Sequence, residues 1–112
     1  MKDPEVFLMH IMDSIEKIED FTNDKTKEDF LEDIQLQDAT IRRIEIIGEA
    51  SKNIPDEFKT QYPAVPWSEM ARTRDKLIHG YFGVDLQLTW DIIQYDLPEL
   101  KEKMHQILEG LK

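Results

Sequence analysis

Three residues close together in the sequence have the types and spacing to do chemistry. Arg74 is followed by His79 after four residues, and Tyr81 comes two residues later. Histidine exchanges a proton near neutral pH without help from its surroundings. Arginine keeps its charge and binds phosphate oxygens in a bidentate fork. The group could therefore hold a phosphate and move a proton beside it, while Gly80 and Gly83 favour a loop that presents the tyrosine.

Arg74 is unusual because its position in the predicted helix 67–78 is one that normally points into a core. Helical spacing predicts an apolar stripe here, and five of its six members are apolar; the stripe is Trp67, Met70, Ala71, Arg74, Leu77 and Ile78. Burying a guanidinium costs free energy, so a buried arginine is expected to have an interaction partner or a function. A structural alternative remains open, namely a buried ion pair with a histidine that stabilises the last helical turn.

The other titratable side chains give weaker signals. His10 and His105 lie on ordinary amphipathic segments, where surface or boundary positions are expected, and no spacing matches a known zinc pattern. We therefore expect no metal site and no cofactor. A solvated face, rather than an acid–base pair, is the expected role of the carboxylates Glu16, Glu19, Asp20, Glu28, Asp29, Glu32 and Asp33.

Length and composition predict a single domain over residues 1–112, without disulfides because the chain has no cysteine. We see no signal peptide and no membrane span, so a cytoplasmic location is expected. The net charge of −10 argues against RNA or DNA binding by bulk electrostatics. The charge is uneven, however: residues 1–38 carry a net −8, residues 39–84 a net +1 and residues 85–112 a net −3. The region with the unusual residues is the only one that would not repel a polyanion.

The elements that must position these residues all read as helices. The pattern predicts an all-α, up-and-down bundle with four to five main helices. We expect helices over 4–21 and 34–53, a short helix capped by Thr26, a helical turn after Pro55, and an extended connection between Pro63 and Pro66. Helix 67–78, a loop over 80–84 and a helix from Asp85 follow, and Pro98 either kinks that helix or starts the last one.

Helix 34–53 has an unusually broad apolar surface, which predicts burial on two sides or a subunit interface. Its two neighbouring stripes are Leu36, Ala39, Arg43, Ile47, Ala50 and Ile54, and Ile34, Ile41, Ile44 and Gly48. We expect part of this surface to form a homodimer, since symmetric two-fold pairing is the commonest closed assembly. Arg43 is a second arginine on an otherwise apolar stripe.

The segment Trp67–Asp85 resembles the signature of the HepT-like family of the HEPN superfamily, toxins of HepT/MntA-type toxin–antitoxin systems. The family motif is an arginine, four residues, a histidine, one residue and a tyrosine, matched by Arg74, His79 and Tyr81. Asp75 is compatible with the superfamily pattern. Residues 39–52 resemble the family's second block and residues 96–100 its C-terminal block, so the resemblance covers nearly the whole chain.

The resemblance implies a metal-independent endoribonuclease that acts as a homodimer, with two motif copies meeting in a cleft. Arg74 and His79 would be catalytic, and transfer RNA is a candidate substrate. Tyr81 would be the residue to which a cognate minimal nucleotidyltransferase, the antitoxin, adds AMP. Supporting or RNA-binding roles would fall to Arg72, Asp75, Lys76 and Arg43.

Two other functions remain open. A catalytically silent helical partner of a nucleotidyltransferase would fit the acidic composition and would need neither Arg74 nor His79. A nucleotide-binding bundle could use Arg74 and Lys76 to hold a phosphate without cleaving anything.

Overall fold

The computed structural model of the chain describes residues 3–77 and 85–111, and for residues 74–77 it describes the backbone alone. These residues form helices and connections without a strand, which confirms the predicted all-α fold. The elements, in chain order, are α1 (Pro4–Thr22), α2 (Lys27–Glu32), α3 (Ile34–Asn53), α4 (Asp56–Gln61), α5 (Trp67–Leu77), α6 (Leu86–Asp91), the π-helix η1 (Ile92–Asp96) and α7 (Leu97–Gly110).

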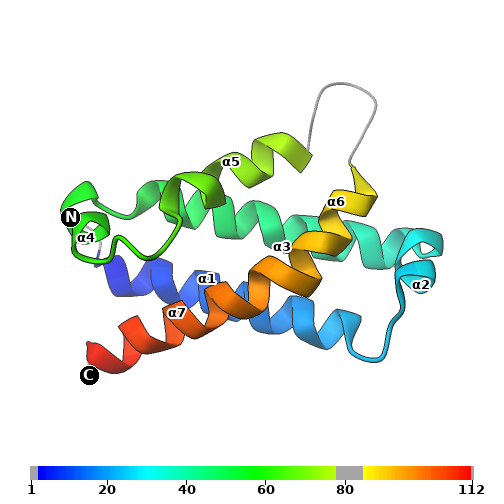
Figure 1. Ribbon diagram of the computed structural model, residues 1–112, viewed down its shortest axis with the longest axis horizontal. Coiled ribbons are helices and arrows are strands. Elements are labelled where there is room, and N and C mark those ends of the chain that lie inside the picture. Colours follow the sequence, from blue (N-terminus) through cyan, green and yellow to red (C-terminus); the bar gives the residue numbers. More distant parts are fainter. Residues whose placement is uncertain (1–2, 78–84, 112) are drawn as a thin grey trace.

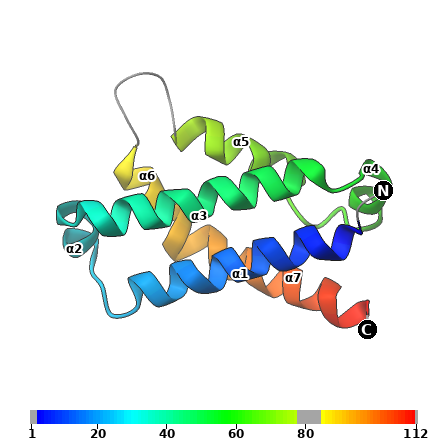
Figure 2. The same cartoon turned by 180° about the vertical axis from the view of Figure 1, so that it is seen from behind.

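The two longest helices, α1 and α3, run antiparallel and side by side (Figures 1 and 2). Helix α5 packs along α3 (Figure 1). Helix α7 crosses α1, and α5 and α7 cover the same face of the α1–α3 pair. Helix α6, η1 and α7 follow one another without a loop and form a single bent rod. The rod begins near the end of α5, so it closes the bundle beside the segment that carries Arg74.

Local side-chain caps explain where several helices begin. Thr26 accepts a hydrogen bond from the Asp29 backbone N–H at 3.1 Å, and the Asp29 carboxylate accepts one from the Thr26 N–H at 2.9 Å. This reciprocal capping box satisfies two amide groups that the first helical turn leaves unpaired. Asp3, Asp33 and Asp85 cap α1, α3 and α6 with their carboxylates. The predicted cap at Thr26 is thus confirmed.

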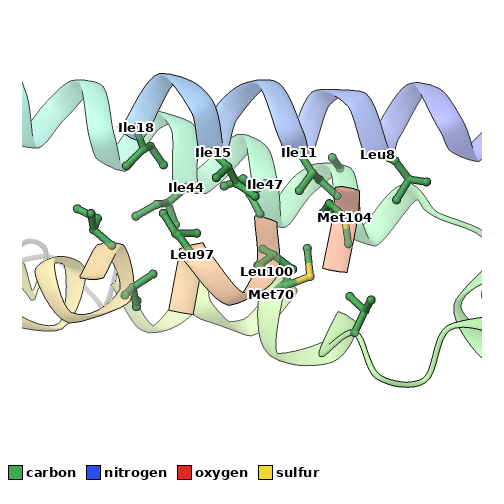
Figure 3. Packing of buried hydrophobic residues seen from close by; sticks show 14 of the residues in the cluster. Leu8, Ile11, Ile15, Ile18, Ile44, Ile47, Met70, Leu97, Leu100 and Met104 are labelled. Carbon is green, nitrogen blue, oxygen red and sulfur yellow. The ribbon is translucent and has the colours of Figure 1, made fainter. Parts of the chain in front are cut away.

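The core lies between the α1–α3 pair and the helices packed on it (Figure 3). The α1 side chains Leu8, Ile11, Ile15 and Ile18 are fully buried, and their helical spacing in the sequence places them on one face of α1. They point toward residues of three other helices, which in Figure 3 are Ile44, Ile47, Met70, Leu97, Leu100 and Met104. Removing such apolar surface from water is the main stabilising contribution to the fold.

Helix α3 lies between α1 and α5, so its broad apolar surface is used within one chain. Burial on two sides is therefore confirmed, and this surface alone no longer requires a second subunit. Ile34 was expected on a buried stripe, and that prediction is wrong because its side chain is 70% exposed. Ile34 is the first residue of the helix, next to the Asp33 cap, where apolar periodicity does not guarantee a packing partner.

One connection differs from its prediction, and the structure decides between the two alternatives for Pro98, which starts the last helix. The segment from Tyr62 to Pro66 forms a turn rather than an extended connection, since the Val65 N–H donates to the Tyr62 carbonyl at 3.2 Å. Pro98 lies at the start of α7, and the five residues Ile92–Asp96 before it form a π-helix. Proline has no N–H to donate and its ring crowds the carbonyl of the preceding turn, so the backbone there widens to an i→i−5 pattern.

Candidate functional site

Helix α5 carries the first half of the candidate motif, and two buried residues fix its start. Trp67 and Met70 are each 7% exposed, as the predicted stripe required. The Trp67 Nε1–H donates a hydrogen bond to the Tyr62 carbonyl at 3.0 Å, which ties the first residue of α5 to the end of α4. Arg74 follows Met70 by one helical turn, so the anchoring of Trp67 and Met70 determines where its backbone lies.

The candidate residues fall at the end of α5 and just beyond it. The backbones of Arg74, Asp75 and Lys76 belong to the last turns of α5, which ends at Leu77. Their side chains, and the whole of Ile78, His79 and Tyr81, lie outside the described residues. The described ends of α5 and α6 lie close together in Figure 1, so the motif is bounded by two helix ends. The roles of these residues, and the burial of Arg74, stay predictions.

The charged residues of α5 are distributed along the helix in the way that the helix dipole favours. Glu69 lies in its first turn, and the cations Arg72, Arg74 and Lys76 lie in its last turns. Negative charge near a helix N-terminus and positive charge near its C-terminus are both stabilising. The Arg72 side chain is exposed. The last turns of α5 therefore carry three cationic residues and one acidic residue, Asp75, on an acidic protein.

Arg43, the second arginine singled out from the sequence, has a partner on the neighbouring helix. Its Nη1 lies 4.0 Å from Oδ2 of Asp13 on α1, and its side chain is 28% exposed. The same carboxylate binds Lys17 Nζ at 2.8 Å, and this hydrogen bond is the main reason that the pKa of Asp13 is lowered. Arg43 thus has an ion-pairing role between α1 and α3, whereas its predicted contact with RNA stays a prediction.

A group of carboxylates near the start of α5 was missed by the sequence analysis. Glu69 of α5 and Asp96 and Glu99 of the rod line a small cleft of about 90 Å³. The pKa of Asp96 is raised, first by partial burial and then by the negative charges of Glu69, Glu99 and Asp91. No short-range sequence signal reveals this cluster, because Glu69 lies far from the others in the chain.

Among the described residues, no group of three or more histidine, cysteine, aspartate or glutamate side chains has a geometry that could hold a metal ion. His10 and His105 are exposed, as predicted, and so are the seven carboxylates that were expected to form a solvated face. No described helix is long and apolar enough to cross a membrane.

The all-helical bundle and the Arg-x4-His-x-Tyr sequence agree with the HepT-like family that the sequence resembles. Comparison with known families agrees: the model of the family described as "Ribonuclease HepT-like" matches residues 11–107. The match includes both the motif and the core helices, and the chain belongs to this family.

Several curated proteins are similar over most of the chain. "Gamma-glutamylcyclotransferase and putative RNase MJ0434" of Methanocaldococcus jannaschii is 56% identical over 110 residues, which are 98% of this chain and 50% of that protein. The chain therefore spans about half the length of this relative. "Probable ribonuclease HepT" of Thermococcus cleftensis is 54% identical over 101 residues, covering 90% of this chain and 92% of that protein. No solved structure matches the chain.

Proposed function

We propose that this protein is a metal-independent endoribonuclease and the toxin of a toxin–antitoxin pair, acting as a homodimer. One observation carries the proposal: Arg74 belongs to the last turns of the anchored helix α5, and His79 and Tyr81 follow it in the sequence at the family spacing. The names of the relatives, which include "Probable ribonuclease HepT", support ribonuclease activity. The cations at the end of α5 support RNA as the substrate, because they offer phosphate contacts on an otherwise acidic chain.

The proposed reaction uses the 2′-hydroxyl of RNA as the nucleophile. A base removes its proton, the oxygen attacks the adjacent phosphorus, and the bond to the 5′-oxygen breaks as an acid protonates that leaving group. The products are a 2′,3′-cyclic phosphate and a free 5′-hydroxyl. His79 is suited to the proton transfers and Arg74 to the charge that develops on the phosphate oxygens. A dimer would supply two histidines, one for each proton transfer.

Alanine variants test this assignment. Arg74→Ala and His79→Ala should each lower RNA cleavage by about 10²-fold or more, the usual contribution of a proton-transfer or charge-stabilising group. Both should relieve growth inhibition and keep the helical circular dichroism of the wild type. Arg42→Ala is the matched control, because Arg42 is exposed on α3 and lies outside the motif.

Cleavage should persist in excess chelator and leave cyclic phosphate ends, which a kinase and phosphatase end-group assay detects. Inhibition by chelator would contradict the metal-independent mechanism. If purified wild-type protein cleaves no cellular RNA, and both variants inhibit growth like the wild type, the catalytically silent partner becomes the better interpretation.

Control of the toxin is proposed to act through Tyr81. AMP added to its phenolic oxygen would place a phosphate two residues from His79, where it would occupy substrate space and pair with Arg74. Intact-mass measurement after co-expression with the cognate nucleotidyltransferase should show one or more added AMP units. Tyr81→Phe should abolish the added mass and remain toxic, whereas a modified and neutralised Tyr81→Phe protein would place control elsewhere.

A further inference from the structure

A groove between the first half of α1 and the second half of α7 has an apolar floor and an acidic rim. Helix α7 crosses α1 in both Figure 1 and Figure 2, and residues of both helices line the groove. The groove has a volume of about 280 Å³. Its floor is lined by Met9 and Met12 of α1 and Leu108 of α7, and its charged rim by Glu5, Glu16, Lys101, His105 and Glu109.

Met9 is the accessible part of the floor, whereas Met12 and Leu108 are partly buried and pack against the core cluster. Met9 is 57% exposed, whereas its neighbours Leu8 and Ile11 are fully buried. Glu5, Met9, Met12 and Glu16 follow one another at i, i+4, i+7 and i+11, which places them along one flank of the helix. Methionine is unbranched and polarisable, so it adapts to different apolar partners.

The charge of the groove is negative because its lysine is already paired. Lys101 Nζ binds Glu19 Oε1 at 2.8 Å. The pKa of Lys101 is raised chiefly by this hydrogen bond and its charge, with smaller contributions from Glu16 and Asp20. Glu5 and Glu109 add two further carboxylates to the rim. A ligand in this groove therefore meets apolar side chains flanked by acids.

We propose that this groove binds a cationic amphipathic helix of a partner protein. Apolar side chains of the partner, at i, i+3 or i+4 and i+7, would lie on Met9, Met12 and Leu108, and its lysines or arginines would face Glu5 and Glu16. The α1 stretch from Glu5 to Glu16 is about 17 Å long, so roughly three helical turns of the partner fit.

Charge complementarity selects this occupant over two others. RNA is a polyanion and would be repelled by the rim. A second copy of this chain would place its own acidic rim against the first, which costs energy where like charges are brought together. The first half of α1 and the second half of α7, which line the groove, lie away from the end of α5 in Figures 1 and 2, so the inference does not depend on the proposed nuclease activity.

A synthetic peptide can test the groove directly. The probe is a fluorescent helix of about 18 residues, with leucines at i, i+4, i+7 and i+11 and lysines on both flanks. Its affinity is measured by fluorescence anisotropy at about 150 mM salt, where long-range charge effects are screened. Met9→Gln should weaken binding about tenfold by removing apolar contact. Glu5→Gln combined with Glu16→Gln should also weaken it and reduce its salt dependence.

The matched control lies on a different acidic surface that also exposes one isoleucine. Glu32→Gln combined with Ile34→Gln changes the region around Asp24, Asp29 and Asp33 and should leave peptide affinity unchanged. Met9 and Ile34 are both largely exposed, so none of these variants should impair folding, and circular dichroism checks that.

Three results would overturn the proposal. The first is no peptide binding by the wild type at about 100 µM, a concentration that detects even weak complexes. The second is equal loss of affinity in the groove and control variants, which would indicate general attraction to an acidic protein. The third is a change of oligomeric state in Met9→Gln during sedimentation, which would make the occupant a second copy.

Discussion

At the scale of single residues, Asp96 has the clearest consequence for stability. The residue is exposed overall, but its carboxyl is partly desolvated and lies near three other carboxylates, so its pKa is raised in the folded protein. The folded state then binds this proton more tightly than the unfolded state does. Stability from this group is therefore greatest below its ordinary pKa of 3.8 and falls as the pH rises through its folded pKa.

Asp96→Asn should consequently raise the melting temperature at pH 7, because the amide keeps the shape of the side chain and removes its charge. The advantage should shrink as the pH falls below the ordinary aspartate range. Thermal unfolding of both proteins between acidic and neutral pH measures this. Asp91→Asn is a suitable comparison, since Asp91 is only the last of the contributors to the shift. A lower melting temperature for Asp96→Asn at pH 7 would contradict the argument.

At the scale of elements, the anchoring of α5 depends on Trp67. Trp67→Phe removes the hydrogen bond to the Tyr62 carbonyl and part of a buried ring. We expect the free energy of unfolding to fall by about 1–3 kcal/mol, the sum of one hydrogen bond and the lost apolar contact. Urea unfolding followed by circular dichroism measures the loss.

Trp90→Phe is the comparison variant. It also replaces a buried tryptophan with phenylalanine, but on α6, where the indole packs on Phe30 with ring centroids 5.5 Å apart. Because Trp67 anchors α5 and α5 carries Arg74, we expect RNA cleavage to fall more in Trp67→Phe than in Trp90→Phe. Equal loss of cleavage in the two variants would indicate a general effect of stability.

Most of the helices could be predicted from the sequence, since apolar spacing and caps are local. The Thr26–Asp29 capping box and the Leu8–Ile18 stripe are examples. The π-helix before Pro98 could not be predicted, because periodicity does not tell whether a proline starts a helix or distorts one. The exposure of Ile34 and the cleft between Glu69 and Asp96 depend on which helices meet, which is a property of the tertiary structure.

For the candidate site, too, the local features could be predicted from the sequence and the tertiary contacts could not. Spacing and family resemblance identified Arg74, His79 and Tyr81. The partner of Arg43 on α1 was not apparent from the sequence, because Asp13 is thirty residues away in the chain. Contacts between two motif copies depend on how subunits associate, which helical periodicity within one chain does not encode.

At the scale of the whole molecule, an acidic chain must bind RNA through few contacts. With a net charge of −10, binding should rest on the cations at the end of α5, namely Arg72, Arg74 and Lys76. For single-stranded RNA, three contacts predict a slope of about −2 for the logarithm of affinity against the logarithm of salt concentration, per protomer engaged. The His79→Ala protein and a short RNA allow this to be measured without cleavage.

Arg72→Gln and Lys76→Gln should each reduce the magnitude of that slope by about 0.7, the value for one lost phosphate contact. Lys52→Gln, an exposed change at the end of α3, should leave it unaltered. A steep slope that none of the α5 variants changes would place RNA on another surface.

The start of α1 and the end of α7 lie at the same end of the bundle, away from the end of α5 (Figures 1 and 2). An additional domain or a purification tag joined at either end would therefore leave the tip of α5 uncovered. Protein prepared for nuclease assays can carry its tag at either terminus, whereas peptide-binding assays need the tag removed because the α1–α7 groove is nearby.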